Sequence, residues 1–381
     1  MKPKALNKIY VGECEVLLPD TRLFPDRSVN LIVTSPPYAE KRKISYGGVR
    51  ESEYVEWFLP IAKELHRILK DDGSFILNIK EHPKNGERCT YVLELVLELK
   101  KQGWFWIEEY CWVKKNAFPG KWQNRFRDSW ERCFHFAKNR KFRMYQDQVK
   151  VPIGDWADKR FKSMTEADFV RRVSKNNSHL ARNVSNWLNK KKVNPSNVLI
   201  FEEEHRLYLS NVVETAVSKS LINHSAIFPI ELPTWFITLF TKEGDVILDP
   251  FMGSGSTAAA SLLLQRRFLG TELFPKYAKA ANKHIKEIET EVLKKHQYKD
   301  KIWKLAKPIR GKDPEIYRQD PYGNELRYDS YGKNSKKGWV IDHIKPVARG
   351  GSEAIRNLQA LKTSVNLAKG DSLNKKSRHN Q

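Results

Sequence analysis

Cysteine is scarce in this chain, and the four that are present, Cys14, Cys89, Cys111 and Cys133, are scattered. No pair has the short spacing of a zinc finger, and nothing indicates a disulfide framework, which fits a reducing, cytoplasmic location. The sequence also lacks an apolar run of about 18 residues, and no apolar signal segment follows Met1. We therefore expect no membrane span and no membrane partner.

Acidic residues are too few to balance the basic ones. The 381 residues contain 68 Lys and Arg against 45 Asp and Glu, a formal net charge of +23. Such an excess favours a polyanionic partner, because each neutralised phosphate releases a counterion. At 40% hydrophobic residues the chain can still form a sizeable core, so wholesale disorder is excluded and two or three domains are expected.

Apolar segments of strand length alternate with amphipathic segments over most of the chain, a pattern typical of an α/β sheet. The pattern predicts strands at 9–12, 29–33, 74–79, 104–107, 110–113, 245–248 and 268–272, and helices at 53–70, 90–102 and 275–295, with a further helix that ends at Leu264. Residues 140–220 interrupt this alternation with 16 Lys and Arg against 9 Asp and Glu. We interpret them as a specificity region inserted between two α/β halves; the alternative is a solvated lobe without a ligand.

A glycine-containing segment, 249–257 (DPFMGSGST), follows the apolar run 246–248. Loops at the carboxyl ends of strands in doubly wound sheets bind ligands, and glycine lets the backbone approach a ligand closely. Glu272 ends the next strand, 23 positions after Asp249, and an acidic residue at that separation suits ribose hydroxyls. An ordinary strand-to-helix turn is the alternative reading.

A second segment, 34–38 (TSPPY), follows the apolar run 31–33. The Ser35 hydroxyl and the Pro36 carbonyl could accept hydrogen bonds from both hydrogens of an exocyclic amino group. Pro37 stiffens the turn with Pro36, and the Tyr38 ring could stack on an extruded base. Taken alone, the segment would equally be a proline-stiffened loop.

Together, in this order, the two motifs resemble the S-adenosylmethionine-dependent amino-methyltransferases of DNA, in the permuted (beta) arrangement where the catalytic half precedes the cofactor half. The resemblance covers about residues 8–290, except for 140–220. It implies a Rossmann-like methyltransferase fold with a mainly parallel sheet, S-adenosylmethionine as cofactor, and duplex DNA with a flipped base as substrate.

The resemblance also assigns residues to pockets. Segment 112–119, followed by Arg125 and Glu131, is similar to the wall of the base pocket, and segment 224–229 is similar to a part that completes the cofactor pocket. The implied cofactor-binding residues are Asp249, Pro250, Phe251, Gly253, Ser254, Gly255, Thr257, Glu272, Ser225, Phe228 and Pro229. The implied catalytic residues are Ser35, Pro36, Pro37 and Tyr38.

The target base follows partly from an absence. Methylation of a cytosine ring carbon needs a thiolate nucleophile, which that other family carries in a Pro-Cys dipeptide, and no cysteine here follows a proline. An amino group is the better target, and Ser-Pro-Pro-Tyr in the resembled family acts mostly on N4 of cytosine. We expect a site-specific N4-cytosine methyltransferase of a restriction–modification system; N6 of adenine, an RNA or protein acceptor, and a non-catalytic DNA-binding protein remain alternatives.

The C-terminal segment 338–346 (GWVIDHIKP), followed by Asn357 and Asn366, resembles an HNH nuclease of the ββα-metal type. The resemblance makes His343 the general base, Asp342 and Asn366 ligands of Mg²⁺ or Mn²⁺, and Asn357 the residue that orients the His343 loop. Zinc-binding Cys pairs are absent, so the expected core comes from Tyr317, Tyr322, Leu326, Tyr328, Trp339 and Leu358. The unit would cut DNA as part of a bifunctional chain, or only bind it.

The expected organisation has five parts. They are the catalytic half (1–139), the target-recognition region (140–220), the cofactor half (221–297), a linker (298–315) and the HNH-like domain (316–381). The last 91 residues carry 21 Lys and Arg against 10 Asp and Glu, as a phosphate binder should. No feature of the sequence indicates an oligomeric state.

Overall fold

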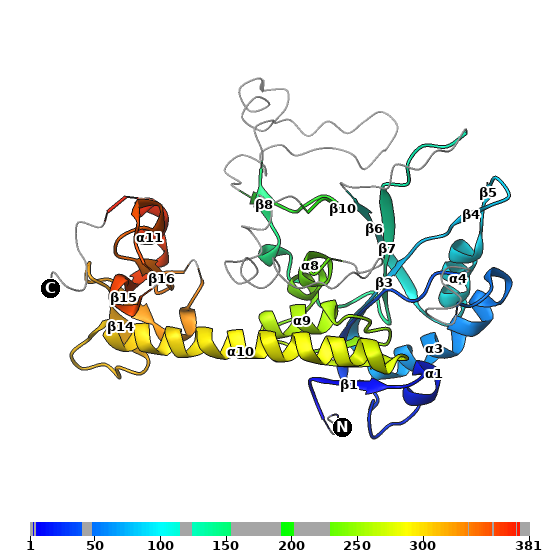
Figure 1. Cartoon of the computed structure of the whole chain (residues 1–381), viewed down its shortest axis with the longest axis horizontal. Coiled ribbons are helices and arrows are strands. Elements are labelled where there is room, and N and C mark those ends of the chain that lie inside the picture. Colours follow the sequence, from blue (N-terminus) through cyan, green and yellow to red (C-terminus); the bar gives the residue numbers. More distant parts are fainter. Residues whose placement is uncertain are drawn as a thin grey trace, which may run out of the picture. The chain divides into compact units, whose positions relative to one another are not determined.

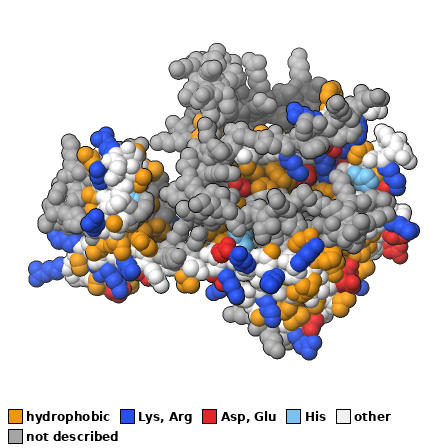
Figure 2. All heavy atoms as spheres, in the orientation of Figure 1, with side chains coloured by type: hydrophobic (Ala, Val, Ile, Leu, Met, Phe, Trp, Pro, Cys, Tyr) orange, Lys and Arg blue, Asp and Glu red, His pale blue; other side chains and the backbone are white. Residues whose placement is uncertain are grey.

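A computed structural model describes residues 3, 5–39, 48–114, 124–153, 192–201, 229–333, 335–352, 354–370 and 372–373. The chain divides into two compact units, Met1–Ile288 and Glu289–Gln381. No helix in the described part of the chain is long and apolar enough to cross a membrane. On the face shown in Figure 2, Lys and Arg side chains lie on both units, in keeping with the basic composition.

The first unit contains an eight-stranded sheet in the order β1-β12-β11-β2-β3-β7-β6-β10 (Figure 1). Five of its seven pairings are parallel, and only the two pairings of β7, with β3 and with β6, are antiparallel. The strands are β1 (Lys8–Val11), β2 (Val29–Thr34), β3 (Leu69–Ile79), β6 (Phe105–Val113), β7 (Trp130–Ala137), β10 (Val198–Leu199), β11 (Val246–Asp249) and β12 (Arg267–Glu272).

The expected parallel arrangement is found in the five neighbouring strands β1, β12, β11, β2 and β3. The antiparallel strand β7 makes the sheet as a whole mixed. Strand β7 is absent from the sequence-based prediction, which took Glu131 only as part of a pocket wall. Strand β7 lies between β3 and β6 in the sheet, and its side chains Cys133, Phe134 and Phe136 are buried. Strand β7 runs antiparallel to both of its neighbours, so the parallel part of the sheet ends at β3.

Helices cover both faces of this sheet. Helices α3 (Tyr54–Ile68) and α4 (Tyr91–Lys101) pack together on one face, while α8 (Glu231–Phe240) and α9 (Ser256–Leu263) pack together on the other (Figure 1). Successive residues of β12 point to opposite faces of the sheet and enter different cores. Phe268 packs with residues of α9 and α10 (Pro275–Leu305), and Leu269 belongs to the core that contains residues of α3 and α4. The result is a three-layer α/β arrangement, as expected from the sequence.

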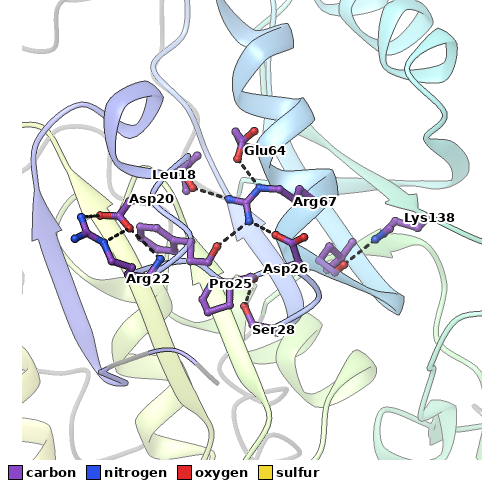
Figure 3. A network of polar contacts seen from close by, with 11 residues as sticks. Leu18, Asp20, Arg22, Pro25, Asp26, Ser28, Glu64, Arg67 and Lys138 are labelled. Carbon is purple, nitrogen blue, oxygen red and sulfur yellow. Dashed lines mark hydrogen bonds and ion pairs between the residues drawn. The ribbon is translucent and has the colours of Figure 1, made fainter. Parts of the chain in front are cut away.

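Arg67, near the end of α3, ties the chain between α1 (Cys14–Leu17) and β2 to the helix (Figure 3). Its guanidinium donates to the carbonyl oxygens of Leu18 at 2.8 Å and Phe24 at 3.0 Å. It also pairs with Asp26 at 2.5 Å and with Glu64 at 2.7 Å. A connection without long secondary structure is thereby fixed next to β2, whose far end carries the Pro-Pro turn.

Helix α10 (Pro275–Leu305) is longer than the helix expected at 275–295 and replaces the first part of the linker expected at 298–315. The physical reason is burial: Ile302 and Trp303 near its end are fully buried in the core of the second unit. Strand β13 (Lys307–Pro308) follows and pairs with β14 (Tyr317–Gln319). The 298–315 segment is therefore folded chain over much of its length.

The second unit has the expected order of two antiparallel strands and a helix. Strands β16 (Trp339–His343) and β17 (Leu358–Lys362) pair, and α11 (Thr363–Lys369) follows. Of the six expected core residues, Leu326, Trp339 and Leu358 are buried and Tyr328 packs against them, whereas Tyr317 is only half-buried and Tyr322 is exposed. The Trp303 ring takes the central position, 5.0 Å from the Trp339 ring.

Candidate active site

The two motifs, more than two hundred residues apart in sequence, lie at the ends of neighbouring strands. Strand β2 ends at Thr34 and β11 ends at Asp249, and the two strands pair in parallel through Leu31–Ile247 and Ile32–Leu248. The Thr34 hydroxyl donates a hydrogen bond of 2.6 Å to the Asp249 carboxylate, and both residues are buried. The loops that follow these two strands therefore lie at one edge of the sheet.

Asp249 braces the loop that it begins. Its Oδ1 accepts from Thr34 and, at 3.0 Å, from the Phe251 backbone N–H, and its Oδ2 accepts from the Thr257 hydroxyl at 2.7 Å. Burial raises the pKa of this carboxyl to about 6, and the hydrogen bonds from Thr34, Thr257 and Phe251 partly oppose that rise. Because its carboxylate accepts three hydrogen bonds from the protein, Asp249 stabilises the start of the loop.

The glycine loop then turns into α9. Gly253 and Gly255 have φ of +55° and +90°, the left-handed region that favours glycine. A Cβ on Gly255 would lie 3.1 Å from the Ala281 Cβ of α10, so the loop is also packed tightly from behind. The buried Pro250 contributes its carbonyl, which accepts from the Thr271 hydroxyl at 2.6 Å, while Ser254 remains partly exposed.

Glu272, at the end of β12, faces the same loop. One carboxylate oxygen accepts from Gly253 N–H at 2.8 Å and the other from Phe274 N–H at 2.9 Å. Burial raises the pKa of Glu272. A carboxylate has about four acceptor positions, so two hydrogen bonds leave acceptor capacity on both oxygens.

Aromatic packing fixes the wall between the two motifs. The Phe251 ring lies 5.8 Å from the Trp57 ring and 6.5 Å from the Phe58 ring, centroid to centroid, both on α3. Tyr54, at the start of the same helix, donates its hydroxyl to the Pro37 carbonyl at 2.8 Å. One helix therefore positions both the cofactor-side loop and the Pro-Pro turn.

Tyr38 is held through its hydroxyl. The hydroxyl donates to Glu131 of β7 at 2.8 Å, and Glu131 also accepts from Asn78 of β3 at 3.3 Å and pairs with Lys114. Burial, followed by the charge of Glu131, raises the pKa of Tyr38 well above its ordinary value, so the phenol stays protonated and remains a donor. Ser35 is partly exposed beside it, and no described residue donates to the Pro36 carbonyl.

The sequence reading missed several of these residues. Tyr54, Asn78 and Thr34 were given no role, although a polar residue inside or at the end of an apolar strand, as at Asn78 and Thr34, is the signal that could have found two of them. Of the upstream pocket segment, Ser225 and Phe228 lie outside the described residues. Pro229 is described, and its carbonyl accepts from the Leu232 N–H at 3.1 Å at the start of α8.

In the second unit, Asp342 is engaged by protein groups. Lys369 of α11 donates to one of its oxygens at 2.6 Å and to the His343 carbonyl at 2.6 Å, and Gln359 donates to the other oxygen at 2.9 Å. The Lys369 and Asp342 side chains are each only 5% exposed. An ammonium thus lies where the resemblance implies a divalent ion, and the residues as arranged do not fit one, with Asn366 partly buried in the same helix.

Asn357 does what the sequence suggested for it. Its amide accepts from Lys345 N–H at 2.9 Å and donates to the carbonyls of Lys345 at 3.0 Å and Ser352 at 2.8 Å. These bonds hold the loop that follows His343.

Residues 29–283 match the N6_N4_Mtase family model, described as DNA methylase. The match spans both motifs and more than half of the chain. The chain belongs to this DNA methylase family. It is a DNA methyltransferase by family, and the second unit lies beyond the matched residues.

Individual relatives agree. The chain is 29% identical over 297 residues to the type II methyltransferase M.PvuII of Proteus hauseri, covering 72% of this chain and 82% of the relative. It is 27% identical over 351 residues to M.BamHI of Bacillus amyloliquefaciens, covering 89% of this chain and 71% of the relative. The solved structure titled PvuII DNA methyltransferase (cytosine-N4-specific) superposes with a TM-score of 0.52 at 23% identity, covering 77% of this chain and 94% of that one, which supports the fold.

The raised pKa of Asp249 predicts a pH-dependent stability. A carboxyl that titrates near 6 when folded and at 3.8 when unfolded binds more protons in the folded state between these values, so its contribution to stability is lost as the pH rises through 6. Asp249→Asn should remove this dependence, worth up to about 3 kcal/mol across the window. Chemical denaturation of both proteins from pH 3.5 to 7.5 checks it; equal pH dependence in the two would contradict it.

Proposed function

We propose that this chain is a site-specific DNA methyltransferase that modifies the exocyclic N4 amino group of cytosine in duplex DNA, with S-adenosylmethionine as methyl donor, in a restriction–modification system. The single observation that carries the proposal is the Thr34–Asp249 hydrogen bond, because it joins the Pro-Pro turn and the glycine loop at one sheet edge. The type II relatives support the restriction–modification context.

The cofactor side fits a nucleoside. Glu272 keeps acceptor capacity after its two backbone hydrogen bonds, as the hydroxyls of a ribose require. Gly253, Ser254 and Gly255 present backbone without bulky side chains, and Phe251 and Thr257 hold the loop from either end. Bound there, S-adenosylmethionine would supply an electrophilic sulfonium methyl group.

The chain's own residues would orient the amino group. The Tyr38 hydroxyl donates a hydrogen bond to Glu131, and the Ser35 side chain hydrogen-bonds to the same phenol. A Ser35 hydroxyl that donates to Tyr38 keeps its oxygen lone pairs for an amino hydrogen, and the Pro36 carbonyl can accept the other. The Tyr54 bond to the Pro37 carbonyl holds this turn in place, so catalysis would come mainly from positioning.

The choice of cytosine over adenine is supported by two facts. The turn contains Ser35 where adenine enzymes of the resembled group mostly have Asp or Asn, and the structural relative is titled cytosine-N4-specific. N6 of adenine is the competing target.

Replacing Ser35 should remove methyl transfer and spare cofactor binding. We expect Ser35→Ala to lower the transfer of labelled methyl groups to duplex DNA by about 100-fold, since one positioned hydrogen-bond partner of the reacting group is lost. Mass spectrometry of the nucleosides should find N4-methylcytosine with the parent chain. Calorimetric affinity for S-adenosylmethionine should be unchanged in the variant. Undiminished transfer in Ser35→Ala, or N6-methyladenine as the product, would overturn the assignment.

For the second unit we propose DNA binding without cleavage. The position that a nuclease would give to a divalent ion is filled by the Lys369 ammonium, whose pairing with Asp342 is almost fully buried. Lys345 is exposed on the loop that Asn357 holds and takes no part in the Lys369–Asp342 pair. Its side chain is therefore suited to contact a phosphate group.

Two measurements separate binding from cutting. Unmethylated duplex DNA should stay intact with the full chain in Mg²⁺ or Mn²⁺. Lys345→Ala should weaken DNA binding several-fold and lower the slope of log affinity against log salt by about one, because one phosphate contact is lost. Metal-dependent cleavage that disappears in His343→Ala would show that the unit is a nuclease instead.

A further inference from the structure

Three side chains with metal-binding atoms converge outside the candidate active site. Glu51 belongs to η1 (Glu51–Glu53), and His82 and Cys89 lie at the two ends of the hairpin formed by β4 (Pro83–Lys84) and β5 (Glu87–Arg88). One ligand atom from each residue lies within 4.8 Å of the other two. Neither the family model nor the motifs assign a role to any of the three.

The spacing of the thiol and the imidazole matches two ligands of one ion. The Cys89 Sγ lies 3.7 Å from the His82 Nε2. With metal–sulfur and metal–nitrogen bonds of typical zinc lengths, two ligands at a tetrahedral angle are about 3.6 Å apart. The other ring nitrogen of His82 is buried and has no hydrogen-bond partner, so no competing bond fixes the ring.

We propose that Glu51, His82 and Cys89 form a binding site for a transition-metal ion of the Zn²⁺ class, with a fourth position left for solvent. The donor set of one thiolate, one imidazole and one carboxylate suits zinc and disfavours Mg²⁺ and Ca²⁺, which take oxygen ligands. Binding requires loss of the Cys89 thiol proton to solvent, so metal uptake releases protons and weakens as the pH falls.

Lys84 is the natural competitor of the ion. Its ammonium lies 3.4 Å from the Glu51 carboxylate, and its side chain is 53% exposed, so it can swing into solvent when a cation arrives. Exposed pairs of this kind are weak, of the order of 1 kcal/mol or less. Removing Lys84 should therefore tighten metal binding.

The site would brace the frame under the Pro-Pro turn. Glu51 comes three residues before Tyr54, which holds the Pro37 carbonyl, and Cys89 comes two residues before Tyr91. The Tyr54 and Tyr91 rings lie 4.8 Å apart, and the Tyr91 hydroxyl donates to the Lys80 carbonyl, two residues before His82. An ion that joins the three ligands thus fixes the segments that carry these two tyrosines.

The test uses the full chain and the metal alone, so it does not depend on methyl transfer. The metal-free protein, titrated with Zn²⁺ by calorimetry, should bind one equivalent, and Co²⁺ should give the near-ultraviolet band of a thiolate ligand. Cys89→Ser and His82→Ala should each weaken binding by at least about 10-fold, and Lys84→Met should strengthen it. Cys111→Ser, at the partly buried cysteine of β6, is the matched control and should bind as the parent does.

A thermal-shift measurement guards against a variant that fails to fold. Zn²⁺ should raise the Tm of the parent and of Cys111→Ser, and raise that of folded Cys89→Ser by clearly less at the same Zn²⁺ concentration. No Zn²⁺ uptake by the parent, or uptake and Tm rise that persist unchanged in Cys89→Ser, would overturn the proposal.

Discussion

The hydrogen bond between the Thr34 hydroxyl and the Asp249 carboxylate is the contact on which the site depends. It joins the ends of β2 and β11, which come from two halves of the chain separated by more than two hundred residues. A buried carboxylate is costly unless it is satisfied, and Thr34, Thr257 and the Phe251 backbone together satisfy it. The same three donors fix the start of the glycine loop, so the cost of burial is offset by a defined loop geometry.

Around this contact, α3 acts on both sides. Trp57 and Phe58 pack on Phe251, and Tyr54 holds the Pro37 carbonyl, so one rigid helix relates the cofactor-side loop to the Pro-Pro turn. On the opposite side, Glu131 holds Tyr38 through its hydroxyl. In this member of the DNA methylase family, α3 therefore holds both loops of the site, and β7 holds Tyr38 from the other side.

Sequence alone placed the strands that end at Thr34 and Asp249 and the loops that follow them, because apolar runs and Pro or Gly punctuation are local signals. It did not place β7, because the position of a strand in a sheet, and its antiparallel direction, depend on partners far away in sequence. It cut α10 short for a related reason. The polar stretch after residue 290 looks like a linker until Ile302 and Trp303 are seen to enter a second core.

The metal expected at Asp342 shows another limit of motif reading. Asp342, His343, Asn357 and Asn366 stand at the expected spacing, yet Lys369, one helical turn after Asn366, supplies the positive charge that Asp342 requires. A motif fixes which residues are present, whereas the identity of the bound cation depends on what else reaches the same carboxylate.

A double-mutant cycle of Thr34→Val and Asp249→Asn, read as calorimetric affinity for S-adenosylmethionine, tests the joining of the two halves most directly. We expect each single variant to bind the cofactor more weakly than the parent. The double variant should bind no more weakly than the more damaging single variant, which corresponds to a coupling energy of about 1 kcal/mol or more. Effects that add within about 0.3 kcal/mol, or a Thr34→Val protein that binds as tightly as the parent, would contradict a site built on this contact.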